Sequence, residues 1–236
     1  MIPSAPGQDP RVDSIPGAHI LNVRDLGVTH YQDTLRLMRE FTDARNAETA
    51  DEIWLLQHEK IFSQGQAGKD EHILDTGNIP IVRSDRGGQV TYHGPGQLIC
   101  YLLLDLKRKQ LDIRGLVSGI EQSVIRLLAS YDVEASTREG APGVYVGGAK
   151  IAALGLRVRR ARSYHGMSLN VAMDLEPFGR INPCGYEGLA VTDLISLGIN
   201  EDISAVSARL LKQLVAHFAY DSITRQGDWR ANSHGE

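Results

Sequence analysis

The chain has 236 residues, of which 42% are hydrophobic and 23% are charged, and its formal net charge is −4. These values are ordinary for a globular protein of one or two domains, and nothing in them favours binding to nucleic acid or to a membrane surface. No run of about 18 apolar residues occurs, so we expect no transmembrane helix. The N-terminus lacks the basic and then apolar segments of a secretory signal, which predicts a soluble cytoplasmic protein.

The first 18 residues, rich in proline and glycine, are predicted to form a flexible arm. Apolar residues at helical spacing then predict helices over residues 29–47, 113–131 and 203–218. Strand patterns occur over residues 19–26, 52–58, 79–83, 97–106, 144–146, 150–159 and 163–171. Residues 97–106 are almost entirely apolar and should lie centrally in a sheet, whereas the last two strands should form a hairpin. This irregular mixture predicts an α/β (α+β) domain with a mixed sheet.

The two cysteines, Cys100 and Cys184, lie in different contexts. Their number and spacing fit neither a disulfide framework nor a zinc site, so we expect no metal. Cys100 lies within the apolar run LICYLLL and should be buried and inert. Cys184 lies in a turn between a proline and a glycine. Such a thiol is more often incidental than catalytic, but a nearby cation that lowers its pKa from about 8.5 would make it a nucleophile.

A glycine-rich segment, RGGQVTYHGPGQ, covers residues 86–97 directly before the central strand. Glycines let the backbone approach a ligand closely, and Arg86 and His93 offer directed polar groups. An ordinary connecting loop explains the composition equally well. The segment matches no phosphate-binding loop or dinucleotide fingerprint, so nothing here demands ATP.

Lys150 follows a turn of small residues and precedes an apolar run. A lysine viewed alone usually lies on a solvated face. Small and apolar neighbours, however, favour partial desolvation, which lowers the pKa of an ammonium group. If the fold brings Lys150 to Cys184, the lysine would stabilise the thiolate.

Four arginines, at positions 157, 159, 160 and 162, cluster around the predicted hairpin turn. A solvated hairpin tip is the simpler interpretation. The alternative is a docking patch for an acidic partner, since clustered charge speeds encounter and orients the partner.

Four segments resemble the lipoyl(octanoyl) transferase family of the biotin and lipoate protein ligase superfamily. They are RGGQVTYHGPGQLICYLLLDL, GAPGVYVGGAKIAALGLRVRR, SYHGMSLNVAMDL and FGRINPCGYEGLAVTDL. The resemblance covers about residues 19–220 in family order. It implies one catalytic domain with a mixed sheet flanked by helices, and it leaves residues 1–18 as an arm and residues 221–236 as a tail.

The resemblance implies transfer of octanoyl from octanoyl-acyl carrier protein to a lysine of lipoyl domains, without a cofactor. The acceptors would belong to 2-oxoacid dehydrogenases and the glycine cleavage H protein. Cys184 would carry the acyl thioester and Lys150 would tune it, while the arginine run becomes a candidate site for the acidic carrier. The implied substrate-binding residues are Arg86, Gly87, Gly88, Gln89, Val90, Thr91, Tyr92 and His93 in the channel, with Ala153, Leu154, Gly155, Gly166, Met167 and Ser168 in the acyl pocket.

The chemistry agrees with this interpretation. Exchange between thioesters is near thermoneutral and conversion of a thioester to an amide is downhill, so covalent catalysis with ping-pong kinetics needs no ATP. Backbone N–H groups near Cys184 and the Gly87–Gly88 turn are candidates for stabilising the tetrahedral oxyanion. Three alternatives stay open: an ATP-dependent lipoate–protein ligase, a thioesterase or amidase, and a non-catalytic protein that binds acyl carrier protein.

Overall fold

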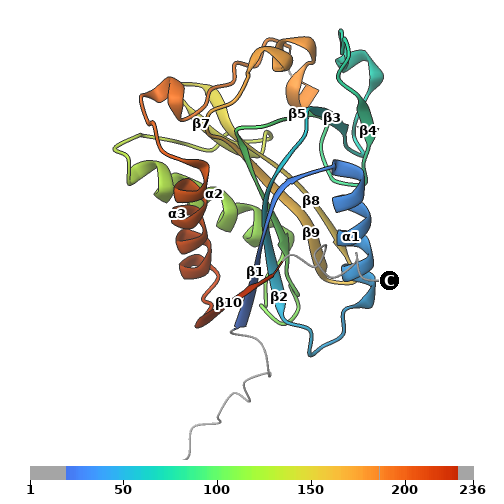
Figure 1. Cartoon of the computed structure of the whole chain (residues 1–236), viewed down its shortest axis with the longest axis vertical. Helices are drawn as coiled ribbons and strands as arrows, with labels where there is room; N and C mark the ends of the chain where they lie inside the picture. The colour runs from blue at the N-terminus through green and yellow to red at the C-terminus, as the bar shows by residue number, and fades with distance from the viewer. Residues whose placement is uncertain (1–19, 186, 228–236) are drawn as a thin grey trace, which may run out of the picture.

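The main element of the fold is a seven-stranded sheet, seen edge-on between helices in Figure 1. The computed structural model describes residues 20–185 and 187–227, apart from the side chain of Cys184, so the arm predicted at residues 1–18 lies outside it. The strand order is β10-β1-β2-β6-β9-β8-β7. Only β10–β1 and β1–β2 are parallel, which confirms the predicted mixed sheet. The bounds are β1 Ile20–Thr29, β2 Asp51–His58, β6 Gln97–Leu103, β7 Gly143–Val146, β8 Ala149–Arg159, β9 Arg162–Asn170 and β10 Ser222–Gln226.

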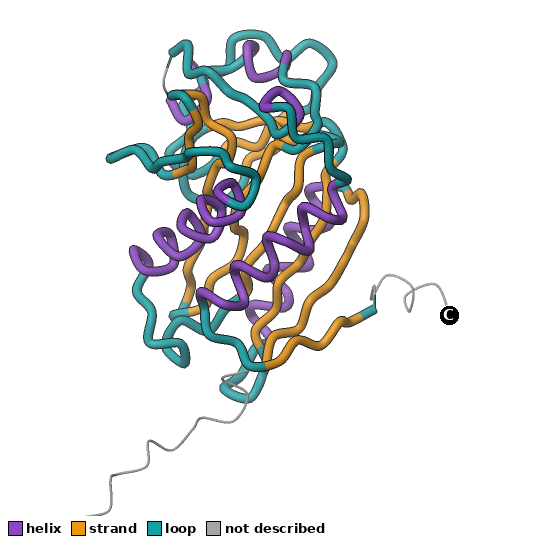
Figure 2. The backbone as a smooth tube through the Cα atoms, turned by 90° about the vertical axis from the view of Figure 1, so that its left-hand side faces the viewer, coloured by secondary structure: helices purple, strands orange, loops and turns teal. Residues whose placement is uncertain are grey.

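Three helices cover the two faces of this sheet. Helix α1 (Tyr31–Ala44) lies on one face, and α2 (Ile113–Ala129) and α3 (Ile203–His217) lie on the other (Figure 1). Figure 2 looks onto the face that carries α2 and α3. None of the helices in the described part of the chain is both long and apolar enough to cross a membrane.

Strand β6 shows why the core forms on both faces. Leu98, Cys100 and Leu102 pack toward α2 and α3, whereas the alternate residues Ile99 and Tyr101 pack toward α1. Side chains alternate between the faces of a strand, so a nearly continuous apolar run fills two cores at once. This confirms the central position predicted for the strand. Cys100 is fully buried, as predicted, and burial raises the pKa of its thiol.

A small second sheet, in the order β4-β3-β5, lies beside the α1 face (Figure 1). It consists of β3 (Ile61–Gln64), β4 (Ile81–Arg83) and β5 (Val90–His93). The glycine-rich segment is therefore not wholly a loop, because it contains β5. A third buried cluster packs this sheet against the short 3₁₀ helix η2 (Glu176–Arg180).

Strand β10 is a further difference from the predicted organisation. It lies within residues 221–236, which the resemblance left as a tail, yet it pairs with β1 at the edge of the main sheet. Its residues are mostly exposed and show no apolar alternation, so no local pattern marked it as a strand. The main sheet therefore extends to Gln226.

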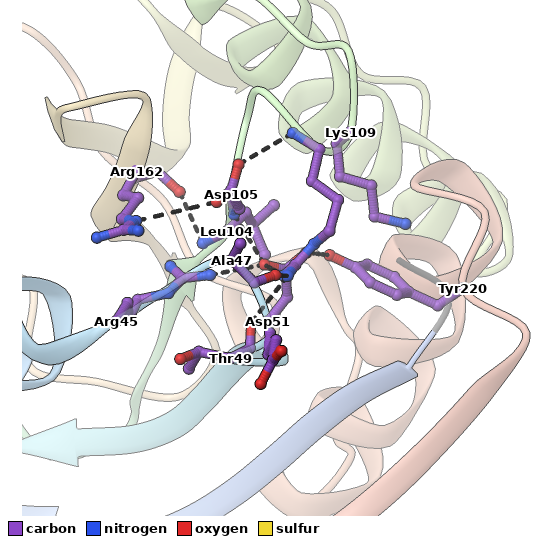
Figure 3. Close-up of polar contacts among 12 residues, drawn as sticks. Arg45, Ala47, Thr49, Asp51, Leu104, Asp105, Lys109, Arg162 and Tyr220 are labelled. Atoms are coloured by element: carbon purple, nitrogen blue, oxygen red, sulfur yellow. Dashed lines mark hydrogen bonds and ion pairs between the residues drawn. The ribbon is translucent and has the colours of Figure 1, made fainter. Parts of the chain in front are cut away.

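The chain just before β10 is held by the buried carboxylate of Asp51 (Figure 3). Asp51 accepts hydrogen bonds from Arg45 Nη2 at 2.7 Å, Arg108 Nη2 at 2.6 Å and the Tyr220 hydroxyl at 2.7 Å. The backbone N–H of Asp105 donates a fourth bond at 2.7 Å. One carboxylate thus ties together the chain after α1, the chain after β6 and the chain that leads into β10.

Candidate active site

Lys150, the second residue of β8, is buried, with 4% of its surface exposed. Its Nζ donates to Pro142 O at 3.2 Å and lies 5.2 Å from the centre of the Tyr145 ring. Its backbone pairs with the chain that follows the Cys184 turn, because Lys150 N donates to Ala190 O at 2.8 Å and Thr192 N donates to Lys150 O at 3.0 Å. The interpretation of Lys150 as a solvated surface residue is therefore wrong.

Gly143 provides the space for this lysine. The residue has φ +143°, and a Cβ there would lie 2.6 Å from Ala152 O and 3.1 Å from Lys150 Cε. Its N–H donates to Glu121 Oε1 at 2.9 Å, which anchors the start of β7 to α2. A side chain at position 143 would displace the lysine. This steric conflict explains why a small residue is needed at this position before Lys150.

The backbone of Cys184 lies in the 3₁₀ turn η3 (Pro183–Gly185). Gly185 N donates to Asn182 O at 3.0 Å, and Asn182 N donates to His72 O at 2.8 Å. Pro183 and Lys150 line the same small cavity, which we call the Lys150 cavity. The fold therefore brings the chain neighbour of Cys184 to the predicted lysine. The complete lining of this cavity is Thr91, Lys150, Ile151, Ala152, Ala153, Ser168, Asn170, Phe178, Pro183 and Val191.

A second cavity, the inner cavity, lies next to the first. Thr91, Ala153 and Ser168 line both, so these residues separate two adjacent spaces. Tyr31, Ile99, Tyr101 and His165 also line the inner cavity. Twelve of the fourteen predicted substrate-binding residues line it, namely Arg86, Gly88, Gln89, Val90, Thr91, His93, Ala153, Leu154, Gly155, Gly166, Met167 and Ser168.

The other two predicted residues, Gly87 and Tyr92, are placed differently. Tyr92 lies on the opposite side of β5, where its ring packs against Phe62 and Phe178, and burial raises its pKa to about 12. Alternation along the strand separates it from its neighbours Thr91 and His93. Gly87 N donates to Leu156 O at 2.9 Å, so this N–H is already used by the fold and does not serve an oxyanion.

Arg86 lines the inner cavity, and its guanidinium is held by hydrogen bonds inside the protein. Its Nε and Nη2 donate to Ser63 Oγ at 3.1 and 3.0 Å, and its other hydrogen bonds go to backbone carbonyls of Ser63, Gly87 and Gln89. A Cβ on Gly155 would meet Arg86 Cδ at 3.0 Å, so the aliphatic part of the arginine lies against β8. The guanidinium holds the turn that precedes β5.

His93 is the centre of a buried hydrogen-bond chain between the two cavities. Its Nδ1 lies 2.7 Å from Gln97 Oε1, and its Nε2 lies 3.0 Å from Ser63 Oγ. Gln97 Nε2 donates to Asn170 Oδ1 at 2.9 Å. Because the Gln97 oxygen only accepts, the network assigns the proton to Nδ1 and lets the serine donate to Nε2. Burial holds the pKa of His93 well below its usual value, so the ring is neutral and orients its neighbours.

A backbone irregularity in β9 builds another part of the wall. His165 has φ +58°, and as a result both Tyr164 and His165 reach Asp85, with contacts of 2.6 and 3.0 Å. Arg39 Nε also donates to Asp85, at 3.1 Å. Burial by itself raises the pKa of Asp85, but the hydrogen bonds from His165, Tyr164 and Arg39 outweigh it and hold the pKa below its usual value. Burial lowers the pKa of His165.

A testable consequence concerns His58, whose Nδ1 lies 3.1 Å from Thr29 O and whose Nε2 lies 2.7 Å from the Tyr101 hydroxyl. Burial lowers its pKa to about 4. Between pH 6.5 and 4 the His58 side chain is protonated in the unfolded chain but neutral in the native protein. The free energy of unfolding therefore falls as the pH falls through this window. Between pH 7 and pH 5 we expect this protonation of His58 to lower the free energy of unfolding by about 2 kcal/mol, as measured by urea unfolding. In the His58→Gln variant the free energy of unfolding should depend less on pH by this amount. An unchanged slope of unfolding free energy against pH would contradict the assignment of this effect to His58.

Comparisons with known proteins identify the family of the chain. The model of the lipoyl protein ligase A/B catalytic domain matches residues 30–215. The chain belongs to this family. Octanoyltransferase of Pseudomonas entomophila strain L48 is 58% identical over 201 residues, covering 85% of this chain and 94% of that protein. Octanoyltransferase of Stutzerimonas stutzeri strain A1501 is 59% identical over 202 residues, covering 86% and 92%.

A solved structure confirms the family fold. The bi-partite lipoate protein ligase of Thermoplasma acidophilum, described with its E2 lipoyl domain, superposes with a TM-score of 0.70. It covers 89% of this chain and 87% of its own, at 16% identity. At that identity the likeness concerns the fold alone, and it confirms the predicted mixed sheet flanked by helices.

The arginine run lies at the tip of the β8–β9 hairpin. Arg159 pairs with Asp43 at 3.2 Å and Arg162 lies 3.9 Å from Asp105, while Arg160 is exposed in the turn. Arg159 is nine residues along β8 from Lys150, or about 30 Å in an extended strand. This position gives the docking hypothesis no support, because a carrier at the tip would sit at the far end of the strand from the lysine.

Sequence reasoning missed several residues of the site. Asn170, Phe178 and Val191 line the Lys150 cavity, and Tyr31 and Tyr101 line the inner cavity. Tyr101 was readable in part, because it shares a strand face with Ile99 in the predicted central strand. Tyr31 carried no such signal, since it begins a helix that is distant in sequence from the glycine-rich segment.

Proposed function

We propose that this protein transfers octanoyl from octanoyl-acyl carrier protein to a lysine of a lipoyl domain, through a thioester on Cys184 with Lys150 as its partner. The observation that supports this most directly is the buried Lys150, which shares a cavity with Pro183 and with three residues that also line the inner cavity. The names of the curated relatives support octanoyl as the group that is transferred. The lipoyl domain studied with the Thermoplasma acidophilum ligase supports the class of acceptor.

In the first step, the Cys184 thiolate attacks the carbonyl carbon of the donor thioester. A new C–S bond forms, the bond to the carrier sulfur breaks, and the departing thiolate takes a proton from the Lys150 ammonium. In the second step, the acceptor amine attacks the Cys184 thioester and gives a proton to the Lys150 amine, while the cysteine leaves as a thiolate. Both catalytic groups return to their starting protonation states, so the cycle needs no ATP.

The test is the intact mass of the protein after incubation with octanoyl-acyl carrier protein. We expect an increase of about 126 Da that hydroxylamine removes, as thioester acylation requires. The Cys184→Ala variant should show no adduct. The matched Cys100→Ala variant, altered at the buried cysteine of β6, should keep it. An unmodified wild-type mass, or an adduct that survives Cys184→Ala, would overturn the proposal.

A ligase that activates lipoate with ATP is the second candidate, because the Thermoplasma acidophilum ligase shares the fold. Its acyl-adenylate route needs no cysteine. If lipoate, ATP and a lipoyl domain gave product with Cys184→Ala as fast as with the wild type, the ligase would replace the transferase. Release of octanoate to water without amide formation would instead indicate a thioesterase, and binding of the carrier without any turnover would indicate a non-catalytic protein.

A further inference from the structure

Helix α2 carries one buried carboxylate, that of Glu121. All other buried residues of this helix are uncharged. The Glu121 carboxylate accepts a hydrogen bond from Gly143 N at 2.9 Å, and it forms no ion pair with any residue in the described part of the chain. A buried charge without a charged partner is costly, and a neutral acceptor would anchor one backbone N–H equally well. Anchoring β7 therefore does not explain why this residue is charged.

The peptide group between Pro142 and Gly143 joins this carboxylate to Lys150. Its N–H, which belongs to Gly143, donates to Glu121 Oε1 at 2.9 Å. Its C=O, which belongs to Pro142, accepts from Lys150 Nζ at 3.2 Å. A trans peptide is planar and its N–H and C=O point in opposite directions, so Glu121 and Lys150 lie on opposite sides of one amide. We call this chain of carboxylate, amide and ammonium the amide link.

The amide link favours the charged form of Lys150. A carboxylate that accepts from the N–H of an amide polarises it, and hydrogen bonds in such a chain strengthen one another by about 10–30%. The Pro142 carbonyl is therefore a stronger acceptor for an ammonium than an ordinary carbonyl. The negative charge of Glu121 also attracts the ammonium through space. Both effects stabilise the ammonium over the neutral amine.

Few other titratable groups in the described part of the chain face Lys150. Among the described residues that line its cavity it is the only charged one, because β5, β9 and η2 contribute uncharged side chains. The Tyr145 ring of β7 lies 5.2 Å from Nζ, and its hydroxyl donates to a backbone carbonyl at 2.9 Å. The segment that pairs with the Lys150 backbone continues to Asp193, whose carboxylate is held by two backbone N–H groups. Cys184, in the turn η3, and Glu121 are then the groups that supply negative charge.

We infer that Glu121 is a positioning residue for Lys150, and that its charge keeps the lysine in the ammonium form that the first transfer step needs. This inference rests on the proposed function, in which the ammonium stabilises the Cys184 thiolate and gives a proton to the departing carrier thiolate. In the acyl-enzyme the lysine has already given up this proton, so the second step starts from the neutral amine. Loss of the charge at position 121 should therefore slow the first step far more than the second.

The experiment measures the two steps separately as a function of pH. Rapid-quench acylation of Cys184 by octanoyl-acyl carrier protein should slow at alkaline pH, as Lys150 loses its proton. In Glu121→Gln, whose amide oxygen still accepts from Gly143 N, this alkaline limb should move down by about one pH unit, because the favourable negative charge is gone. At a pH on the limb, acylation should then be about tenfold slower than in the wild type. Single-turnover transfer from the isolated octanoyl-enzyme to a lipoyl domain should change by less than about threefold.

Glu52→Gln is the matched control, because it makes the same chemical change at another buried glutamate. Glu52 lies on β2 with 3% of its surface exposed, and it accepts from Arg24 Nε at 2.7 Å and from Trp54 Nε1 at 2.6 Å. It lines neither the Lys150 cavity nor the inner cavity. Glu52→Gln should lower the free energy of unfolding but keep the alkaline limb of the wild type.

The outcomes separate this inference from the proposed function. If the wild type forms no thioester at any pH, the transferase proposal fails, and the inference fails with it. If the wild type is acylated but shows no alkaline limb, or if Glu121→Gln keeps the wild-type limb, only the role of Glu121 is overturned and the residue merely anchors β7. If Glu121→Gln does not fold, Glu121→Met decides by the same limb, because it also removes the charge.

Discussion

Replacing Lys150 with methionine should slow formation of the Cys184 thioester by about a thousandfold while the fold stays intact. Methionine keeps an unbranched apolar side chain in the buried site but removes the ammonium. A cation close to a thiol favours its thiolate by one to three pKa units, and a positioned proton donor contributes about 10²–10⁴ in rate. The measurement is rapid-quench acylation by octanoyl-acyl carrier protein, with urea unfolding as the test of folding.

Lys109 offers a matched control for this substitution. Its Nζ donates to Phe218 O at 2.9 Å and lies 3.5 Å from the centre of the Tyr220 ring, so it too contacts a carbonyl and an aromatic ring. Lys109→Met therefore removes a similar group outside the two cavities and should leave the acylation rate within about twofold. A Lys150→Met enzyme as fast as this control would show that the lysine has no part in the chemistry.

Replacing Asp51 with asparagine should destabilise the protein by about 4 kcal/mol. Asp51 has 0% of its surface exposed, and its carboxylate is shared by the guanidinium groups of Arg45 and Arg108, which are themselves buried. Removing one partner of a buried ion pair leaves an uncompensated charge, at a cost of about 3–5 kcal/mol. Asparagine also cannot accept all four hydrogen bonds that the carboxylate receives, including the one from Tyr220 (Figure 3). Urea unfolding at pH 7 measures the effect.

Asp43→Asn is the control for Asp51→Asn, because it makes the same chemical change at an exposed pair. Asp43 and Arg159 lie 3.2 Å apart with both side chains largely in solvent. Such pairs contribute about 0–1 kcal/mol, so this variant should unfold almost like the wild type. If Asp51→Asn lowered the free energy of unfolding no more than Asp43→Asn does, the hydrogen bonds of Asp51 would not be what holds the chain before β10 in place.

The candidate site was predictable only in part. Lys150 and twelve of the pocket residues were readable because they lie in motifs that resemble a known family, and those residues line the two cavities. The sequence did not reveal how Gly87, expected near the oxyanion, and Arg86, expected in the substrate channel, use their hydrogen-bond donors. Each is a hydrogen-bond donor whose partner lies on another strand, Leu156 for the glycine and Ser63 for the arginine. A motif gives the residue type but not the partner that already occupies its polar groups.

The amino-acid sequence by itself determined the strong periodic elements, the central place of β6, the burial of Cys100 and the family. These follow from local patterns, since apolar spacing and motif order are properties of neighbouring residues. Only the tertiary structure decided that β10 completes the sheet, that Tyr92 turns away from the cavity and that Tyr31 lines it. Those outcomes depend on contacts between residues far apart in the chain. The local sequence pattern allows many such contacts equally well. Only the burial of side chains in the folded protein stabilises one set of them over the others.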